Sequence, residues 1–191
     1  MKKTYLFLII LIGFIGRAQN PIIDLLSRDG KRDYNAYYKD TNNILNQFEG
    51  TWIYTNGTTS FKIVLIKKEL AYSGSYYEDL IIGEYQYIKD GEELYNSLYL
   101  LDENLNNLYD HTINGNNFPT TSTPFEAYTS DIFRIKLSLE EPYMGCNIDL
   151  KRTVINGQDA LLMFKNCQAL ATQQYPQVLS PSGIYILIKQ P

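Results

Sequence analysis

The start of the fold is decided by one stretch of the chain, which reads Gln47-Phe48-Glu49-Gly50-Thr51-Trp52-Ile53-Tyr54-Thr55-Asn56-Gly57. A polar, helix-like segment leads into this stretch, and Asp40-Thr41 is suited to cap it. We expect this short helix to end at Gly50 and a β-strand to begin at Trp52, the single tryptophan of the chain. The stretch therefore predicts where the sheet starts and which side chain anchors its core.

The dipeptide Asn56-Gly57 is typical of a two-residue hairpin turn, and a second strand follows from Thr59 to Lys67. If Asn56 and Gly57 are the two turn residues, Trp52 lies opposite Phe61 in the pair of strands. We therefore predict Trp52 and Phe61 as the core that closes one end of a barrel.

The rest of the chain repeats this pattern of strands and turns. Predicted strands cover Leu80–Ile88, with Gly83 as a candidate bulge, and Glu93–Leu100 after the turn Asp90-Gly91. Residues 102–126, rich in Asn, Thr, Ser and Pro, read as a long loop. Further strands flank Asn156-Gly157 and end the chain. About eight or nine sequential strands predict an all-β fold: an antiparallel up-and-down meander that forms a barrel or a half-open barrel.

The first 18 residues have the features of a secretory signal peptide. Lys2 and Lys3 precede an apolar run, and Gly16-Arg17-Ala18 has small residues at the positions that a signal peptidase reads. We expect residues 19–36 to form an irregular arm and residues 37–191 a single domain. The predicted location is outside the cytoplasm, in the periplasm or beyond it, with no integral membrane segment after cleavage.

Charge and composition exclude some partners. Removal of residues 1–18 takes away three basic residues and no acid, so 14 basic and 21 acidic residues leave a net charge of about −7. Nucleic-acid binding needs clustered Lys and Arg, which the chain does not have, so we expect no nucleic-acid partner. Seventeen tyrosines and many Asn-Gly turns favour strands over helices.

Cys146 and Cys167 are the only cysteines. A two-residue turn at Asn156-Gly157 places them directly opposite each other in a non-hydrogen-bonded pair, where Cα atoms are close enough for a disulfide. Export to an oxidising compartment favours the same bond. The alternatives are two separately buried thiols or, far less favoured, part of a metal site. The same register places Lys165 beside Ile148, which suggests a bulge.

No constellation of catalytic residues stands out. His111, the single histidine, lies beside Asp110 in the loop-rich stretch, and we interpret it as a surface residue. Glu140-Glu141 and Glu92-Glu93 are adjacent acids at turns, which are usually solvated. The sequence predicts no catalytic residue, no cofactor and no bound metal, and hence no enzyme.

The tyrosines are the remaining functional candidates. Most are explained by packing within the sheet, but Tyr54, Tyr85, Tyr87 and Tyr95 are candidates to line a ligand inside the barrel. Aromatic rings with hydroxyl groups suit a small apolar or amphipathic molecule.

Two resemblances add to this interpretation. Gly50-Thr51-Trp52 resembles the Gly-x-Trp motif of lipocalin-type barrels, in which the Trp closes the barrel base under a basic residue, here Lys189. The mature chain also resembles a family of small exported proteins from flavobacteria-like bacteria (domain of unknown function, family 6705). The matching segments are Tyr37 to Asn43, Phe48 to Trp52, Gly83-Glu84-Tyr85 and Ile186 to Gln190. This second resemblance implies export and a compact domain, and no activity.

Two functions follow from these observations. The first is a non-catalytic binding module for a small apolar or amphipathic ligand. The second is a structural or protein-interaction component of the cell envelope, with a solid barrel interior and an envelope protein as its partner.

Overall fold

The computed structural model describes residues 20–27, 30–121, 123–127, 131, 133–142, 144–167 and 180–191. The predicted signal peptide, residues 1–18, lies outside these ranges. Within them, no helix has both the length and the apolar character needed to cross a membrane.

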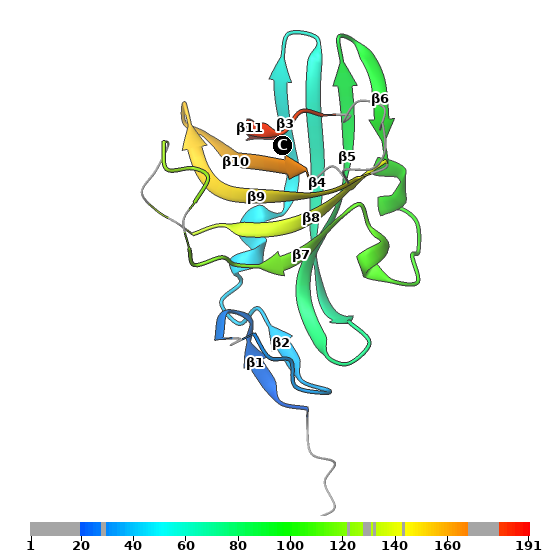
Figure 1. The fold of residues 1–191 in the computed structure, drawn as a ribbon, viewed down its shortest axis with the longest axis vertical. Helices are drawn as coiled ribbons and strands as arrows, with labels where there is room; N and C mark the ends of the chain where they lie inside the picture. The colour runs from blue at the N-terminus through cyan, green and yellow to red at the C-terminus, as the bar shows by residue number, and fades with distance from the viewer. Residues whose placement is uncertain are drawn as a thin grey trace, which may run out of the picture.

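Eight antiparallel strands form a closed barrel (Figure 1). In barrel order they are β3 (Gly50–Asn56), β4 (Thr59–Tyr72), β5 (Tyr77–Lys89), β7 (Ile113–Asn117), β8 (Ile135–Glu141), β9 (Met144–Ile155), β10 (Gln158–Cys167) and β11 (Gly183–Lys189). The pairings β5–β7 and β11–β3 close the ring. The prediction of an all-β antiparallel barrel is therefore confirmed, in its closed form.

Three further strands extend the sheet beside β5. β6 (Glu92–Asn96) pairs with one half of β5, while β1 (Ile22–Asp24) and β2 (Tyr37–Lys39) form a parallel pair at the other end of that strand. β1 and the 3₁₀ helix η1 (Leu25–Ser27) both fall in the segment 19–36, which we expected to be irregular.

The short helix predicted before the barrel is not shown as an α-helix. Residues Ile44–Phe48 form η2, a 3₁₀ helix, and two more short 3₁₀ helices, η3 (Leu98–Leu101) and η4 (Leu108–Asp110), follow later. The capping role of Asp40 is present, because its carboxylate accepts hydrogen bonds from the amides of Ile44 and Leu45 at 2.8 and 3.0 Å. A single short turn makes too few bonds to sustain an α-helix, so it tightens to 3₁₀ geometry.

The register of the first hairpin differs from the prediction. Trp52 pairs with Ile63, and Phe61 pairs with Tyr54, because the turn residues are Gly57 and Thr58. Gly57 takes a φ of +59°, which suits the first position of a Gly-x hairpin turn. Both turns keep the same side chains on the inner face, so the hydrophobic pattern did not distinguish them.

Two other local predictions are corrected. Gly83 is not a bulge: the strands β4 and β5 approach so closely there that a Cβ atom would lie 2.5 Å from the carbonyl oxygen of Val64. The irregularity in this pair falls between Lys68 and Ala71 instead. The predicted long loop 102–126 contains β7, which the barrel needs for closure.

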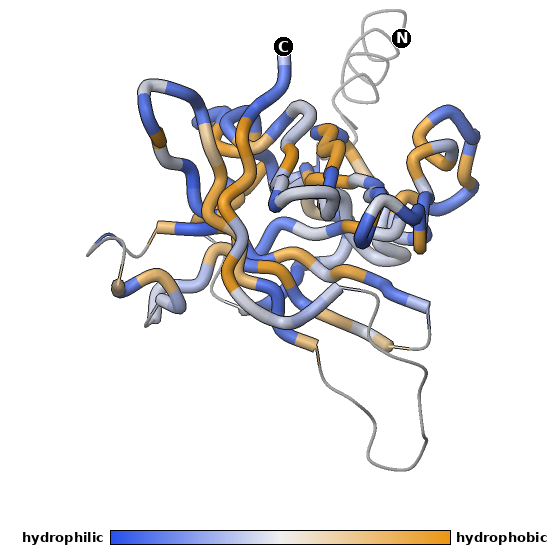
Figure 2. Tube along the Cα trace, turned by 90° about the horizontal axis from the view of Figure 1, so that it is seen from above, coloured by the Kyte–Doolittle hydropathy of each residue, from blue (hydrophilic) through white to orange (hydrophobic). Residues whose placement is uncertain are grey.

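The barrel interior is filled by side chains of its own strands. Hydrophobic and hydrophilic residues are interleaved along the strands (Figure 2), and the inward residues form one large cluster. Many of its members have no accessible surface at all, including Trp52, Phe61, Ile63, Tyr85 and Leu150. A side chain without accessible surface borders no water-sized space, so the interior is solid around these residues.

Candidate functional site

One end of the barrel, which we call the tyrosine end, is lined by six aromatic rings: Tyr54, Phe61, Tyr85, Tyr87, Tyr95 and Tyr185. The ring of Phe61 is stacked on Tyr85 with centroids 5.3 Å apart and on Tyr185 at 5.9 Å. Tyr95 stacks on Tyr85 at 4.6 Å. The rings thus form one continuous aromatic cluster.

The structure brings together the four tyrosines that the sequence singled out. Tyr85 and Tyr87 are buried, and Tyr54 and Tyr95 are partly buried at the margin of the cluster. Each of the four rings contacts another ring of the cluster. A role for Tyr54, Tyr85, Tyr87 and Tyr95 in lining a ligand stays a prediction.

A buried ion pair lies at the same end. Lys165 on β10 binds the carboxylate of Glu141 on β8, and their side chains are 0% and 1% exposed. The Lys165 Nζ also donates to the carbonyl oxygen and the Oγ of Ser180, at 2.6 and 2.5 Å. Two expectations are therefore corrected: Glu141 is not a solvated turn acid, and Lys165 sits in a regular strand pair with Ile148, without a bulge.

The hydrogen bonds of this ion pair define its chemistry. An ammonium group has three hydrogen-bond donors. Lys165 directs one to Glu141 and two to oxygen atoms of Ser180. Burial lowers the pKa of Lys165, while the Glu141 carboxylate opposes that shift. A lysine that donates three hydrogen bonds is protonated and cannot act as a base toward the Ser180 hydroxyl.

Two buried oxygen atoms at this end have no hydrogen-bond partner among the described residues: Tyr85 Oη and Glu141 Oε2. Burial raises the pKa of Tyr85, and the nearby Glu141 carboxylate raises it further. Unsatisfied buried oxygens are costly, so a donor or cation that reached either atom would be favoured there.

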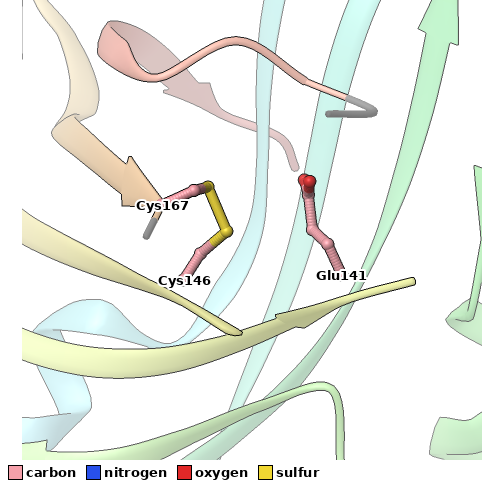
Figure 3. Close-up of side chains that lie close together, drawn as sticks. All are labelled: Glu141, Cys146 and Cys167. Carbon is pink, nitrogen blue, oxygen red and sulfur yellow. A yellow bond between two sulfur atoms is a disulfide. The ribbon is translucent and has the colours of Figure 1, made fainter. Parts of the chain in front are cut away.

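The predicted disulfide between Cys146 and Cys167 is confirmed. The two residues pair directly across β9 and β10, with Cα atoms 4.1 Å apart. Figure 3 shows the Glu141 side chain beside this bond, and one ligand atom from each of the three residues lies within 4.8 Å of the others. In the disulfide form the sulfur atoms are not thiolates, so this group is not a metal site as it stands.

The opposite end of the barrel, which we call the tryptophan end, carries Trp52 and the 3₁₀ helix η2. The indole Nε1 donates to the carbonyl oxygen of Phe48 at 2.8 Å. Two cations lie over the indole ring, Lys189 Nζ at 5.1 Å and the Arg152 guanidinium at 5.3 Å from its centroid. Gly50 leaves room for Lys189, because a Cβ there would lie 3.0 Å from the lysine Cε. The basic residue expected over Trp52 is thus present, and the closing role of Trp52 and Phe61 stays a prediction.

The outer face of β5 carries another buried acid, Glu84. Its Oε1 lies 2.9 Å from His111 Nδ1 and accepts from the Thr112 amide at 3.2 Å. His111 is only 3% exposed, so the prediction of a surface histidine is wrong. The segment that carries η3 and η4 crosses this face and covers the pair, which gives His111 a structural role in holding that segment to the sheet.

A cleft of about 1060 Å³ lies on the outside of the barrel. Its lining combines residues of the N-terminal segment, among them Leu25 and Arg32, with residues of β7 and β8. This volume is at the upper end of the range of small-molecule sites. Six apolar residues contribute to its lining: Leu25, Leu26, Phe118, Pro119, Phe133 and Leu137.

The acidic and the basic side chains that line the cleft differ in their bonding partners. Of the two acids that line it, Glu78 accepts from the Tyr109 hydroxyl at 2.7 Å and Asp131 is ion-paired with Lys151 at 2.5 Å. The two cations that line it, Arg32 and Lys136, have no carboxylate within ion-pair distance among the described residues. The guanidinium of Arg32 instead lies over the rings of Tyr38 and Tyr76, at 5.1 and 5.4 Å.

Sequence reasoning missed this cleft and the buried ion pair. Arg32 belongs to the segment that was expected to be irregular, and the cleft forms only when that segment lies against β7 and β8. Glu141 and Lys165 did carry a signal. Each falls in the inward phase of an apolar strand, where a charge needs a partner of opposite sign.

A family model described as "Family of unknown function (DUF6705)" matches residues 1–190. No curated protein matches the chain, and no solved structure does.

Proposed function

Because the chain belongs to the DUF6705 family, whose description assigns no activity, we propose its function from its own residues: a non-catalytic binding module for a small amphipathic anion. The ligand would occupy the outer cleft between the N-terminal segment and β7–β8. The observation that carries this proposal is the pairing of an apolar lining with two cations, Arg32 and Lys136, that have no carboxylate within ion-pair distance among the described residues.

The apolar part of the ligand would pack against the leucine and phenylalanine side chains. Phe118 and Phe133 are stacked with centroids 5.6 Å apart, and Phe133 keeps 37% of its surface exposed. Leu26, also lining the cleft, is 45% exposed. Covering these surfaces removes apolar area from water, which favours binding by roughly 25 cal/mol per Å².

The anionic group of the ligand would bind Arg32 and Lys136. The Nε of Arg32 is a buried donor with no acceptor among the described residues, and an anion would satisfy it. A charge-assisted hydrogen bond of this kind is shorter and stronger than a neutral one.

The solid interior of the barrel supports an external site. Tyr85 and Phe61 have no accessible surface, so a ligand among the predicted tyrosines would have to displace packed rings. The cleft needs no such rearrangement.

Calorimetric titration with three probes of equal chain length tests the proposal: dodecanoate, dodecanol and dodecyltrimethylammonium, each below its micelle concentration. We expect dodecanoate to bind most tightly. Lys136→Gln and Arg32→Gln should each weaken dodecanoate by about tenfold, the equivalent of ~1.4 kcal/mol, and leave dodecanol unchanged.

The matched control is Lys62→Gln, since Lys62 is also half-buried but lies on β4, outside the cleft lining. It should leave all three affinities unchanged. Equal binding of the cationic and anionic probes, or equal loss in the control, would overturn the proposal.

The packed core favours a second candidate, a structural or protein-interaction component of the cell envelope. Exposed apolar side chains at the tip of the β4–β5 hairpin, Leu70 at 57% and Tyr72 at 52%, suit contact with another protein. This candidate predicts no saturable heat with any of the three probes, and crosslinking from Tyr72 to an envelope protein in intact cells.

Both candidates assume export to the periplasm or beyond. The disulfide supports it, because such bonds persist in oxidising compartments. Cell fractionation with a thiol count on the mature protein measures it: a cytoplasmic protein with two free thiols would contradict export.

A further inference from the structure

Three side chains at the tyrosine end are of types that bind metal ions, but two of them are joined to each other in the disulfide. Glu141, Cys146 and Cys167 come from β8, β9 and β10, which are neighbours in the barrel, and their ligand atoms lie within 4.8 Å of one another. Figure 3 shows the carboxylate of Glu141 level with the disulfide and separated from it by a small gap.

We propose that reduction of the Cys146–Cys167 disulfide converts this end of the barrel into a site for one thiophilic divalent cation, held by both thiolates and Glu141. Two sulfur ligands and one carboxylate match the preferences of Zn²⁺ and its relatives, with a fourth position left open. The orphaned oxygen Glu141 Oε2 is the second observation that points to a ligand, since it is buried and has no hydrogen-bond partner in the described chain.

The charges of the proposed site balance. Two thiolates and the Glu141 carboxylate carry three negative charges, and the divalent cation with the Lys165 ammonium carries three positive ones. Lys165 already binds the other oxygen of Glu141, Oε1, so that Oε2 is left for the metal. Neutrality matters here because an uncompensated charge is costly in a buried position.

The redox step requires an external dithiol. Its two thiols become a disulfide, and the two electrons break the bond between the sulfur atoms of Cys146 and Cys167. Each of these sulfur atoms takes up one proton, and metal binding then releases both protons. Access is available, because Cys167 is only partly buried at the margin of the core, whereas Cys146 is 4% exposed.

The test uses the full mature chain, reduced anaerobically and freed of reductant, with Cd²⁺ as the probe. We expect the reduced chain to bind one Cd²⁺, to show the absorption band of two cadmium–thiolate bonds, and to release two protons. The oxidised chain should show none of these. Cys167→Ser should weaken binding by about 100-fold or more, since even indirect changes around a metal cost 10–100-fold.

Glu141→Gln tests the third ligand, and its readout separates a ligand from a structural residue. It should lower Cd²⁺ affinity by about 10-fold or more while the thiolate band per bound metal stays the same. The matched control is Glu140→Gln on the exposed face of β8, which should change nothing.

Thermal unfolding covers the case in which a variant or the reduced chain is unstable. A site in the folded barrel raises the melting temperature of the reduced protein as Cd²⁺ is added, whereas binding to unfolded thiols lowers it. A lowered melting temperature, an absent thiolate band or unchanged affinity in Glu141→Gln would each overturn the proposal.

Discussion

The two ends of the barrel use charged side chains in opposite ways. At the tryptophan end, Lys189 and Arg152 lie over an indole ring while Lys189 stays exposed to water. At the tyrosine end, Lys165 is fully buried and its charge is met by Glu141 and Ser180. One end therefore keeps cations at its rim, and the other places an ion pair inside the core.

The two arrangements differ in how much folding stability is lost when one of their side chains is replaced. An exposed cation over an aromatic ring adds a small stabilisation and loses little when removed. A buried ion pair contributes little net stability as a pair, but it becomes strongly destabilising when one partner is lost. The tyrosine end should thus respond to single substitutions far more than the tryptophan end.

The largest effect is expected from Glu141→Gln, which leaves the Lys165 ammonium buried without its counter-charge. We expect a loss of about 3–5 kcal/mol in the free energy of unfolding. Urea unfolding followed by Trp52 fluorescence measures it. The control is the double variant Glu141→Met with Lys165→Met, which should lose much less. A single-variant loss below about 1 kcal/mol would show that the pair is not buried as described.

Removal of the disulfide is the next largest change. Cys146→Ser with Cys167→Ser frees a loop with a sequence separation of 21 residues, and the loss expected from loop entropy is about 3 kcal/mol. Urea unfolding under the same conditions gives the value. Treatment of the wild-type chain with reductant should cause the same loss of unfolding free energy. If the reduced protein were as stable as the oxidised one, the stabilising role of the disulfide would be contradicted.

Alkaline pH should destabilise the tyrosine end. Burial raises the pKa of Tyr185 and Tyr85 above the ordinary value of 10.0, so above that pH the folded state binds more protons than the unfolded state. Stability is full below pH 10 and falls by about 1.4 kcal/mol per pH unit for each such tyrosine above it.

The corresponding variant is Tyr185→Phe, which should flatten the fall of unfolding free energy above pH 10. Tyr34→Phe is the control, because Tyr34 is 75% exposed and should leave the slope as it is. Identical slopes in the wild type and Tyr185→Phe would argue against burial of that hydroxyl.

The smallest effect is expected at the tryptophan end. Lys189→Ala removes one cation from the indole face and should cost about 0.5–1 kcal/mol, while Lys189→Arg should keep most of it. The same urea titrations resolve the difference when they are run in replicate. A cost as large as that of Glu141→Gln would remove the contrast between the two ends.

Features that depend on residues close together in the sequence could be predicted from the sequence. The pairing of Cys146 with Cys167 follows from counting outward from the turn Asn156-Gly157, and the structure keeps that register along the whole of β9 and β10. The same counting failed by two residues at Asn56-Gly57, because the neighbouring Gly57-Thr58 also makes an acceptable turn.

Features that depend on distant segments were not predictable. β7 has one buried apolar residue, Ile113, and is otherwise asparagine and glycine, so its strand character comes from pairing with β5 and β8. The partners Glu141 and Lys165 lie on two strands separated by β9, and their side chains meet on the inner face of the sheet. The cleft likewise depends on how the N-terminal segment meets the barrel.

The seam between β11 and β3 has a consequence for the order of folding. Only two residue pairs, Ile53 with Ile188 and Trp52 with Lys189, join these strands, together with one bond from the Gln190 amide to Thr51. The edge of the first barrel strand, β3, is thus covered only when β11, the last strand in chain order of the described barrel, pairs with it. Closure through such distant contacts is slow, so we expect the pairing of β3 with β11 to be among the last steps of folding.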